Sequence, residues 1–214
     1  MADFVVIGLG AFGSALAREL YNRGHTVLGI DRSEKAVNDH QDLLTNVLLA
    51  DATNEAALKE AGVTDADCCI VAIGDHVEDN ILVTQTLIDL KVKRIWSRAE
   101  NPRHATILAK LGVERVVDPE LEAAHRCARV LGSKNILDLI EFSPGFSLAQ
   151  VVVGPENSGK TLRELDFRKR YQAMVVAIKR KETIFVVTPD DKILEGDILF
   201  VAGKSEAIEK LEKI

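Results

Sequence analysis

The strongest constraint on the fold of this chain is a short apolar run near its N-terminus, followed by three glycines. The run covers residues 4–7, and Gly8, Gly10 and Gly13 have G-x-G-x-x-G spacing. An apolar run without alternation is typical of a parallel strand that is buried on both faces. In such a turn the first glycine permits the tight turn, the second lets the backbone approach a pyrophosphate, and the third lets a helix pack on the strand. The helix expected over residues 14–21 would direct free N–H groups toward phosphates.

A second strand and an acidic residue follow. Residues 26–30 predict a strand that ends at Asp31, near the offset of about 20 residues at which a carboxylate binds ribose hydroxyls. This order of features, a strand, a glycine turn, a helix, a second strand and an acid, predicts a binding site for a mononucleotide or dinucleotide. The alternative role for Asp31 is that of a loop acid that caps the next helix.

Strands and helices continue to alternate up to residue 118. Four more strands are expected at residues 46–50, 68–73, 94–97 and 114–117, and Ser33 is the expected N-cap of the second helix. The other expected helices cover residues 55–61, 77–90 and 102–111. Six strands that alternate with five helices predict an α/β fold with a Rossmann-like, doubly wound parallel sheet over residues 1–118.

The alternation stops at Asp118 and Pro119. Helices expected at residues 120–131 and 135–142 would form a helical connector over residues 119–145 that packs against another subunit. Residues 146–214 predict a small α+β domain, which is too small to supply a second wall for an active site. Its expected elements are strands at residues 147–153 and 198–202, a helix at 161–169, a hairpin of 173–179 with 183–187, and a helix that starts at Ser205.

Bulk composition narrows the classes of function. The net charge of −6 argues against nucleic acid as a partner. No run approaches the ~18 apolar residues of a membrane span, and the chain enters a strand without a signal peptide, so we expect a cytoplasmic protein. Cys68, Cys69 and Cys127 lack zinc or disulfide spacing, and we expect buried, inert thiols.

Several short motifs occur in a fixed order along the whole chain. They are Gly8-Leu9-Gly10-Ala11-Phe12-Gly13, Gly29-Ile30-Asp31, Asp51-Ala52-Thr53, Val71-Ala72-Ile73-Gly74, Ile95 to Asn101, Asp118-Pro119-Glu120, Gly159-Lys160-Thr161-Leu162 and Leu194-Glu195-Gly196-Asp197. With these motifs the chain resembles the cytoplasmic regulatory subunits of bacterial potassium uptake systems of the Ktr and Trk type. Those proteins join an RCK N-terminal domain (regulator of potassium conductance) to a small TrkA-C, or RCK-C, domain.

The resemblance implies a regulator and not an enzyme. Family members bind adenine nucleotides (ATP, ADP or AMP) or NAD(H) without consuming them. They form homodimers that assemble into an octameric ring beneath a membrane potassium-translocating subunit, at the inner face of the cell membrane. Ligand exchange changes the shape of the ring and so controls transport.

The resemblance also implies roles for individual residues. The implied nucleotide-binding residues are Gly8, Gly10, Ala11, Phe12, Gly13, Asp31, Arg32, Asp51, Ala52, Thr53, Ala72, Ile73, Gly74 and Arg98. Glu120 occupies a position at which relatives hold a divalent cation. The second domain carries residues near which some relatives bind cyclic di-AMP: Leu162, Leu165, Asp166, Arg168 and Tyr171.

Simpler interpretations stay open for several of these positions. Arg98 could be a solvated surface charge, Glu120 an acid favoured by the helix dipole, and Leu162 and Leu165 the core face of a short helix. Relatives commonly carry arginine where this chain has Ala11, which puts tight discrimination for ATP in doubt. An NAD-dependent oxidoreductase is the alternative function, with His76 as its one plausible acid near the cleft.

Overall fold

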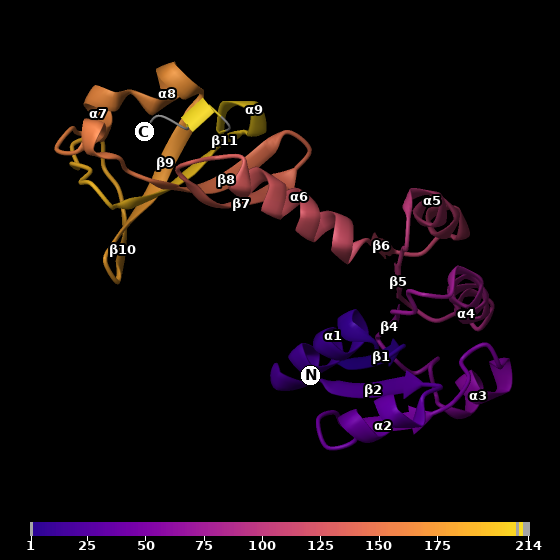
Figure 1. Ribbon diagram of the computed structural model, residues 1–214. Coiled ribbons are helices and arrows are strands. Elements are labelled where there is room, and N and C mark those ends of the chain that lie inside the picture. The colour runs from indigo at the N-terminus through magenta and orange to yellow at the C-terminus, as the bar shows by residue number, and fades with distance from the viewer. Residues whose placement is uncertain (1, 209, 212–214) are drawn as a thin grey trace. The chain divides into compact units, whose positions relative to one another are not determined.

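The computed structural model describes residues 2–208, 210 and 211, and the chain divides into two compact units. The first unit extends to Pro119 and the second begins at Glu120. Figure 1 shows the elements of each unit along the chain. Among the described helices, none is both long and apolar enough to cross a membrane.

The first unit is a six-stranded parallel sheet with the strand order β3-β2-β1-β4-β5-β6. Its strands are β1 (Asp3–Ile7), β2 (Thr26–Asp31), β3 (Asn46–Leu49), β4 (Cys68–Val71), β5 (Ile95–Arg98) and β6 (Arg115–Val117). Its helices are α1 (Ala11–Asn22), α2 (Glu34–His40), α3 (Glu55–Glu60), α4 (Val77–Asp89) and α5 (Pro102–Leu111). The predicted doubly wound, Rossmann-like fold is confirmed. The strand order reverses between β1 and β4, which is the switch point where such sheets bind ligands.

Both faces of this sheet are covered. Val6 of β1 belongs to an apolar cluster with Ala17 of α1, whereas Val5 and Ile7 belong to another with Leu87 of α4. Successive side chains of a strand point to opposite faces, so each face needs its own layer of helices. This explains the uninterrupted apolar runs in the sequence.

Polar side chains cap three helices of the first unit. Ser33 accepts a hydrogen bond from the backbone N–H of Ala36, and Asn54 accepts one from Ala56 N. Asn101 caps α5, which ends at Gly112 in the left-handed conformation (φ 90°). These caps satisfy N–H groups that have no partner within the helix and so define where each helix begins.

The second unit contains a five-stranded antiparallel sheet in the order β10-β9-β11-β8-β7. Its strands are β7 (Ile136–Ser143), β8 (Phe146–Val152), β9 (Ala173–Arg180), β10 (Thr183–Val186) and β11 (Ile198–Lys204). Its helices are α6 (Pro119–Leu131), α7 (Leu162–Leu165), α8 (Phe167–Tyr171) and α9 (Ser205–Ile208), with a 3₁₀ turn at Pro155–Asn157. The predicted α+β class is confirmed.

The helix predicted over residues 135–142 is wrong, because this segment is strand β7. It pairs with β8 through a tight turn at Pro144 and Gly145, with Ser143 opposite Phe146. Gly145 has a φ of 82°, which suits the third position of a turn that carries proline at its second. Of the expected connector helices only α6 forms, and residues 136–143 lie in the second sheet.

Two smaller expectations also need correction. The helix predicted over residues 161–169 is interrupted at Asp166, whose left-handed φ of 43° separates α7 from α8. Cys127 is exposed, whereas Cys68 and Cys69 are buried as expected. Burial raises the pKa of Cys68 to about 11 and that of Cys69 to about 12, so both stay protonated at neutral pH.

Candidate functional site

The glycine turn between β1 and α1 is built as the sequence predicts. Gly8 has a φ of 95°, and a Cβ added there would lie 3.1 Å from the backbone of Ala72 and Ile73. A Cβ at Gly13 would overlap the Gly8 carbonyl oxygen, whereas one at Gly10 would meet no atom within 4 Å. The backbone at Gly10, the N-cap of α1, is therefore open to a ligand. The first N–H groups of α1 suit a phosphate there.

Asp31 joins the end of β2 to this turn. Its Oδ2 accepts a hydrogen bond from the backbone N–H of Leu9 at 2.6 Å, and its Oδ1 accepts one from Ser33 N at 2.8 Å. These two bonds fix the carboxylate in orientation while each oxygen keeps a further lone pair. Asp31 thus braces the start of α2, as the alternative interpretation expects, and can also accept bonds from ribose hydroxyls.

The turn after β3 is held by its own side chains. Thr53 donates to Asp51 Oδ1 from its backbone N–H at 2.9 Å and from its hydroxyl at 2.7 Å. These bonds favour the ionised carboxylate and lower the pKa of Asp51. Ala52 is buried beneath the turn.

Gly74 and Arg98, from the ends of β4 and β5, are brought into contact. A Cβ at Gly74 would lie 2.6 Å from Arg98 Cζ, so the guanidinium packs directly on the glycine. The Arg98 side chain is only 16% exposed and lies 3.7 Å from Glu100 Oε2. The interpretation of Arg98 as a solvated surface charge is therefore wrong.

Residues on α4, which the sequence reasoning missed, connect these strand ends. Asn80 is fully buried and its Nδ2 donates to the carbonyl oxygens of Ile73 at 2.8 Å and Arg98 at 3.0 Å. Asp79 beside it pairs with Arg32, which follows β2, at 3.2 Å. One feature of the sequence could have indicated these residues: Asn80 and Thr84 are polar and lie one turn apart on the buried face of an apolar helix.

Two other residues that the sequence singles out are Glu120 and His76. Glu120 lies in the second unit, at the exposed start of α6, and its role as a cation ligand stays a prediction. In the described part of the chain, no group of three or more His, Cys, Asp or Glu side chains is placed to hold a metal. His76 is the N-cap residue of α4 but makes no side-chain cap bond.

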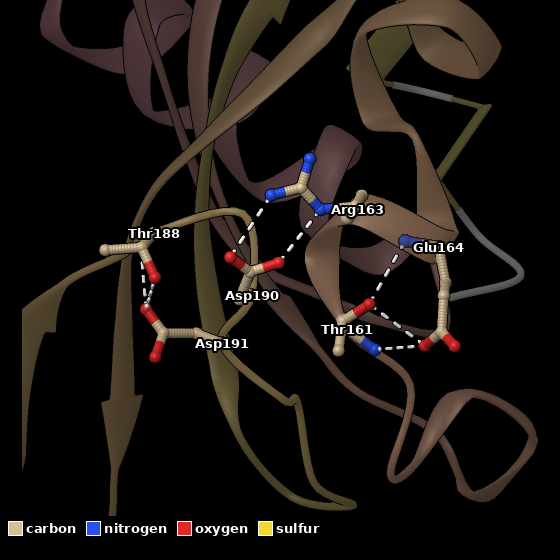
Figure 2. A network of polar contacts seen from close by, with 6 residues as sticks. All are labelled: Thr161, Arg163, Glu164, Thr188, Asp190 and Asp191. Carbon is tan, nitrogen blue, oxygen red and sulfur yellow. Dashed lines mark hydrogen bonds and ion pairs between the residues drawn. The ribbon is translucent and has the colours of Figure 1, made fainter.

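The second unit has a pocket of its own, of about 360 Å³. It is lined by Leu162, Arg163, Asp166, Phe167, Arg168, Met174, Val175, Val187, Thr188 and Pro189. Figure 2 shows the polar network beside it: Arg163 makes a bidentate pair with Asp190, and Thr161 and Glu164 cap α7 reciprocally. Leu165 is buried in the apolar core, as the simpler interpretation expects, and Leu162 packs against that core.

Two family models match the chain. The TrkA-N domain covers residues 4–119 and the TrkA-C domain covers residues 148–214. The chain belongs to the TrkA-N domain family. The TrkA-N match ends where the first compact unit ends, at Pro119.

Two relatives that match nearly the whole chain have potassium uptake names. The chain is 37% identical over 212 residues to Ktr system potassium uptake protein C of Bacillus subtilis, covering 99% of this chain and 96% of the relative. It is 33% identical to Ktr system potassium uptake protein A of the same organism, covering 98% and 95%. The resemblance seen in the motifs is therefore confirmed.

Solved structures share the fold. The RCK domain of GsuK matches with a TM-score of 0.70 at 19% identity, over 100% of this chain and 48% of that one. The C-terminal domain of Shewanella denitrificans Kef in its AMP-bound form matches with a TM-score of 0.55 at 25% identity, over 62% of this chain and 83% of that one. The expected RCK-type fold is confirmed.

Proposed function

We propose that this protein is a nucleotide-sensing regulatory subunit of a potassium uptake system. The observation that carries the proposal is the joint geometry of the Gly10 turn and the braced Asp31 carboxylate, on a chain 37% identical to a potassium uptake protein. The ligand is an adenine nucleotide or NAD(H), and the AMP-bound relative supports the former. Bound at the switch point, the phosphates lie at the start of α1 and the ribose at Asp31.

The nucleotide acts as a signal in this proposal and leaves chemically unchanged. It must bind one conformation of the assembly more tightly than another, because equal affinity for both would shift no equilibrium. The partner is a membrane potassium-translocating subunit, which the protein contacts from the cytoplasm as homodimers in an octameric ring. A divalent cation at Glu120 and cyclic di-AMP at the second unit's pocket belong to the same proposal.

Binding without turnover tests this function. Calorimetric titration with ATP, ADP, AMP and NADH gives the affinities, and mass analysis after incubation shows whether each ligand is unchanged. With Ala11 at the start of α1, we expect ATP and ADP to bind within about tenfold of each other, because no arginine there reaches a terminal phosphate. Oxidation of NADH with a small-molecule acceptor would support an oxidoreductase instead, and no binding of any of the four would exclude the proposal.

A further inference from the structure

The first turn of α4 connects strand ends on the side of the switch point that lies away from Asp31. Asn80 donates both amide hydrogens, one to the carbonyl of Ile73 after β4 and the other to the carbonyl of Arg98 at the end of β5. These two carbonyls lie 25 residues apart in the sequence. A single side chain therefore holds two strand ends at one spacing.

The acceptor side of the same amide is occupied too. Asn80 Oδ1 accepts from the Ser97 hydroxyl at 2.9 Å, and the Thr84 hydroxyl lies 3.2 Å from that of Ser97. All three side chains are fully buried. Since both donors and the acceptor of the amide are engaged, its plane cannot rotate without breaking bonds in a low-dielectric interior.

The backbone that Asn80 holds lies next to the glycine turn. Gly8 packs on the peptide that joins Ala72 to Ile73, and the Arg98 guanidinium packs on Gly74. Asn80 thus fixes Gly74 and Arg98 with respect to Gly8, although it lies beneath the surface that a ligand would contact.

The order of strands decides which part of a ligand these residues meet. Asp31 ends β2 and the turn at Asp51 follows β3, on one side of β1, whereas Gly74 follows β4 and Arg98 ends β5, on the other side. When the ribose binds at Asp31 and the first phosphate at Gly10, only the groups beyond that phosphate extend toward β4 and β5.

We propose that Asn80 is a positioning residue for the distal half of the nucleotide, namely the second phosphate of ADP and everything beyond it in NADH. The inference rests on the proposed function. Without the amide, Gly74 and Arg98 move independently, and their geometry is no longer set in advance for a ligand. AMP, which ends at the first phosphate, does not depend on them.

The test is a comparison of affinities in the full-length Asn80→Ala variant. Calorimetry with AMP, ADP and NADH should show the affinities for ADP and NADH lowered at least tenfold, with that for AMP within threefold of the wild type. Val83→Ala is the matched control, because Val83 is fully buried on the same helix. It should lower the unfolding temperature and leave the ratio of ADP to AMP affinity unchanged.

An unchanged ratio in folded Asn80→Ala, or an equal change in Val83→Ala, would overturn the proposal, since a merely structural role predicts those results. If Asn80→Ala does not fold, Ser97→Ala replaces it. This variant removes the Ser97 hydroxyl and its 2.9 Å hydrogen bond to Asn80 Oδ1, and should lower the ratio at least threefold. An unchanged ratio there also counts against the proposal. A wild type that binds none of the three ligands would instead contradict the proposed function.

Discussion

At the scale of a single residue, Asp31 has one structural role and one proposed role. Its carboxylate accepts hydrogen bonds from Leu9 and Ser33, and so it holds the glycine turn and the start of α2 together. The same oxygens can accept bonds from a ribose. In the proposed role the carboxylate is already ordered before the ribose binds, so less conformational entropy is lost on binding.

Removal of this carboxylate should weaken nucleotide binding. We expect Asp31→Ala to cost on the order of 1.5–3 kcal/mol of binding free energy, the range for hydrogen bonds to a charged group. Calorimetry with AMP and ADP measures the change. Asp39→Ala removes an equal charge from the exposed surface of α2 and should have no effect on affinity. An unchanged affinity in folded Asp31→Ala would remove Asp31 from the site.

At the scale of one element, Gly13 and Gly10 of the β1–α1 turn are expected to have different roles. Gly13→Ala should lower the stability by roughly 1–3 kcal/mol, because its Cβ would overlap the Gly8 carbonyl oxygen. Gly10→Ala should leave stability within about 0.5 kcal/mol, since its Cβ meets no atom within 4 Å and its φ is −67°. It should nevertheless weaken nucleotide binding, because the methyl group occupies the side that a phosphate approaches. Urea unfolding and calorimetry on both variants separate the two effects, and equal stability losses would contradict this division.

Helix α6 and strand β7 are joined by charged pairs. Arg126 makes a bidentate pair with Asp138 at 2.9 and 2.7 Å, and Arg129 pairs with Glu141 at 2.8 Å. The hydrogen bonds from Arg126 lower the pKa of Asp138 below its ordinary value. A carboxyl with a lowered folded pKa adds stability above its unfolded pKa of about 3.9, and this stability is lost as the pH falls through the folded value.

The contribution of this pair should therefore vanish in acid. We expect Arg126→Ala to lower the free energy of unfolding slightly at pH 7, because ion pairs between exposed side chains contribute little. The difference from wild type should shrink as the pH falls below the unfolded pKa of about 3.9 and through the lowered folded pKa of Asp138. Urea unfolding at pH 7 and in steps toward pH 2 measures it, with exposed Lys134→Ala as the control for a lost positive charge. A difference that persists unchanged at pH 2 would assign the effect of Arg126 to packing.

At the scale of the whole molecule, the second unit leaves large apolar side chains exposed. Leu131 is 85% exposed and Phe142 is 67% exposed, and Leu137 and Ile140 of β7 are about half exposed. Ile136 and Leu139 of the same strand are instead buried in the unit's own core. Apolar patches of this kind usually mark interfaces.

We therefore expect a homodimer in solution. Light scattering coupled to gel filtration should report a mass at least twice that of the 23.4 kDa chain. Phe142→Glu should shift the protein toward monomer, because a charge that is buried in an apolar interface is costly to desolvate. Exposed Lys169→Glu on α8 changes charge away from this patch and is the control. A wild type that is monomeric at micromolar concentration, with and without nucleotide, would contradict this expectation.

The sequence by itself determined the features that depend on neighbours in the chain. The unbroken apolar runs, the glycine spacing, the acid at Asp31 and the caps at Ser33 and Asn54 each follow from local sterics and hydrogen bonding. These features were enough to predict the parallel sheet and the geometry of the glycine turn, whereas the binding of ribose by Asp31 stays a prediction.

Only the tertiary structure decided the features that depend on distant partners. Five of the eight residues of β7 are apolar, at spacings that fit a helix as well as a strand, and the pairing with β8 selected the strand. Nothing local indicates that Asn80 reaches the carbonyls of Ile73 and Arg98, or that Arg98 lies on Gly74. A hydrogen bond between strand ends needs both ends in place, and the packing of the sheet and α4 alone brings them together.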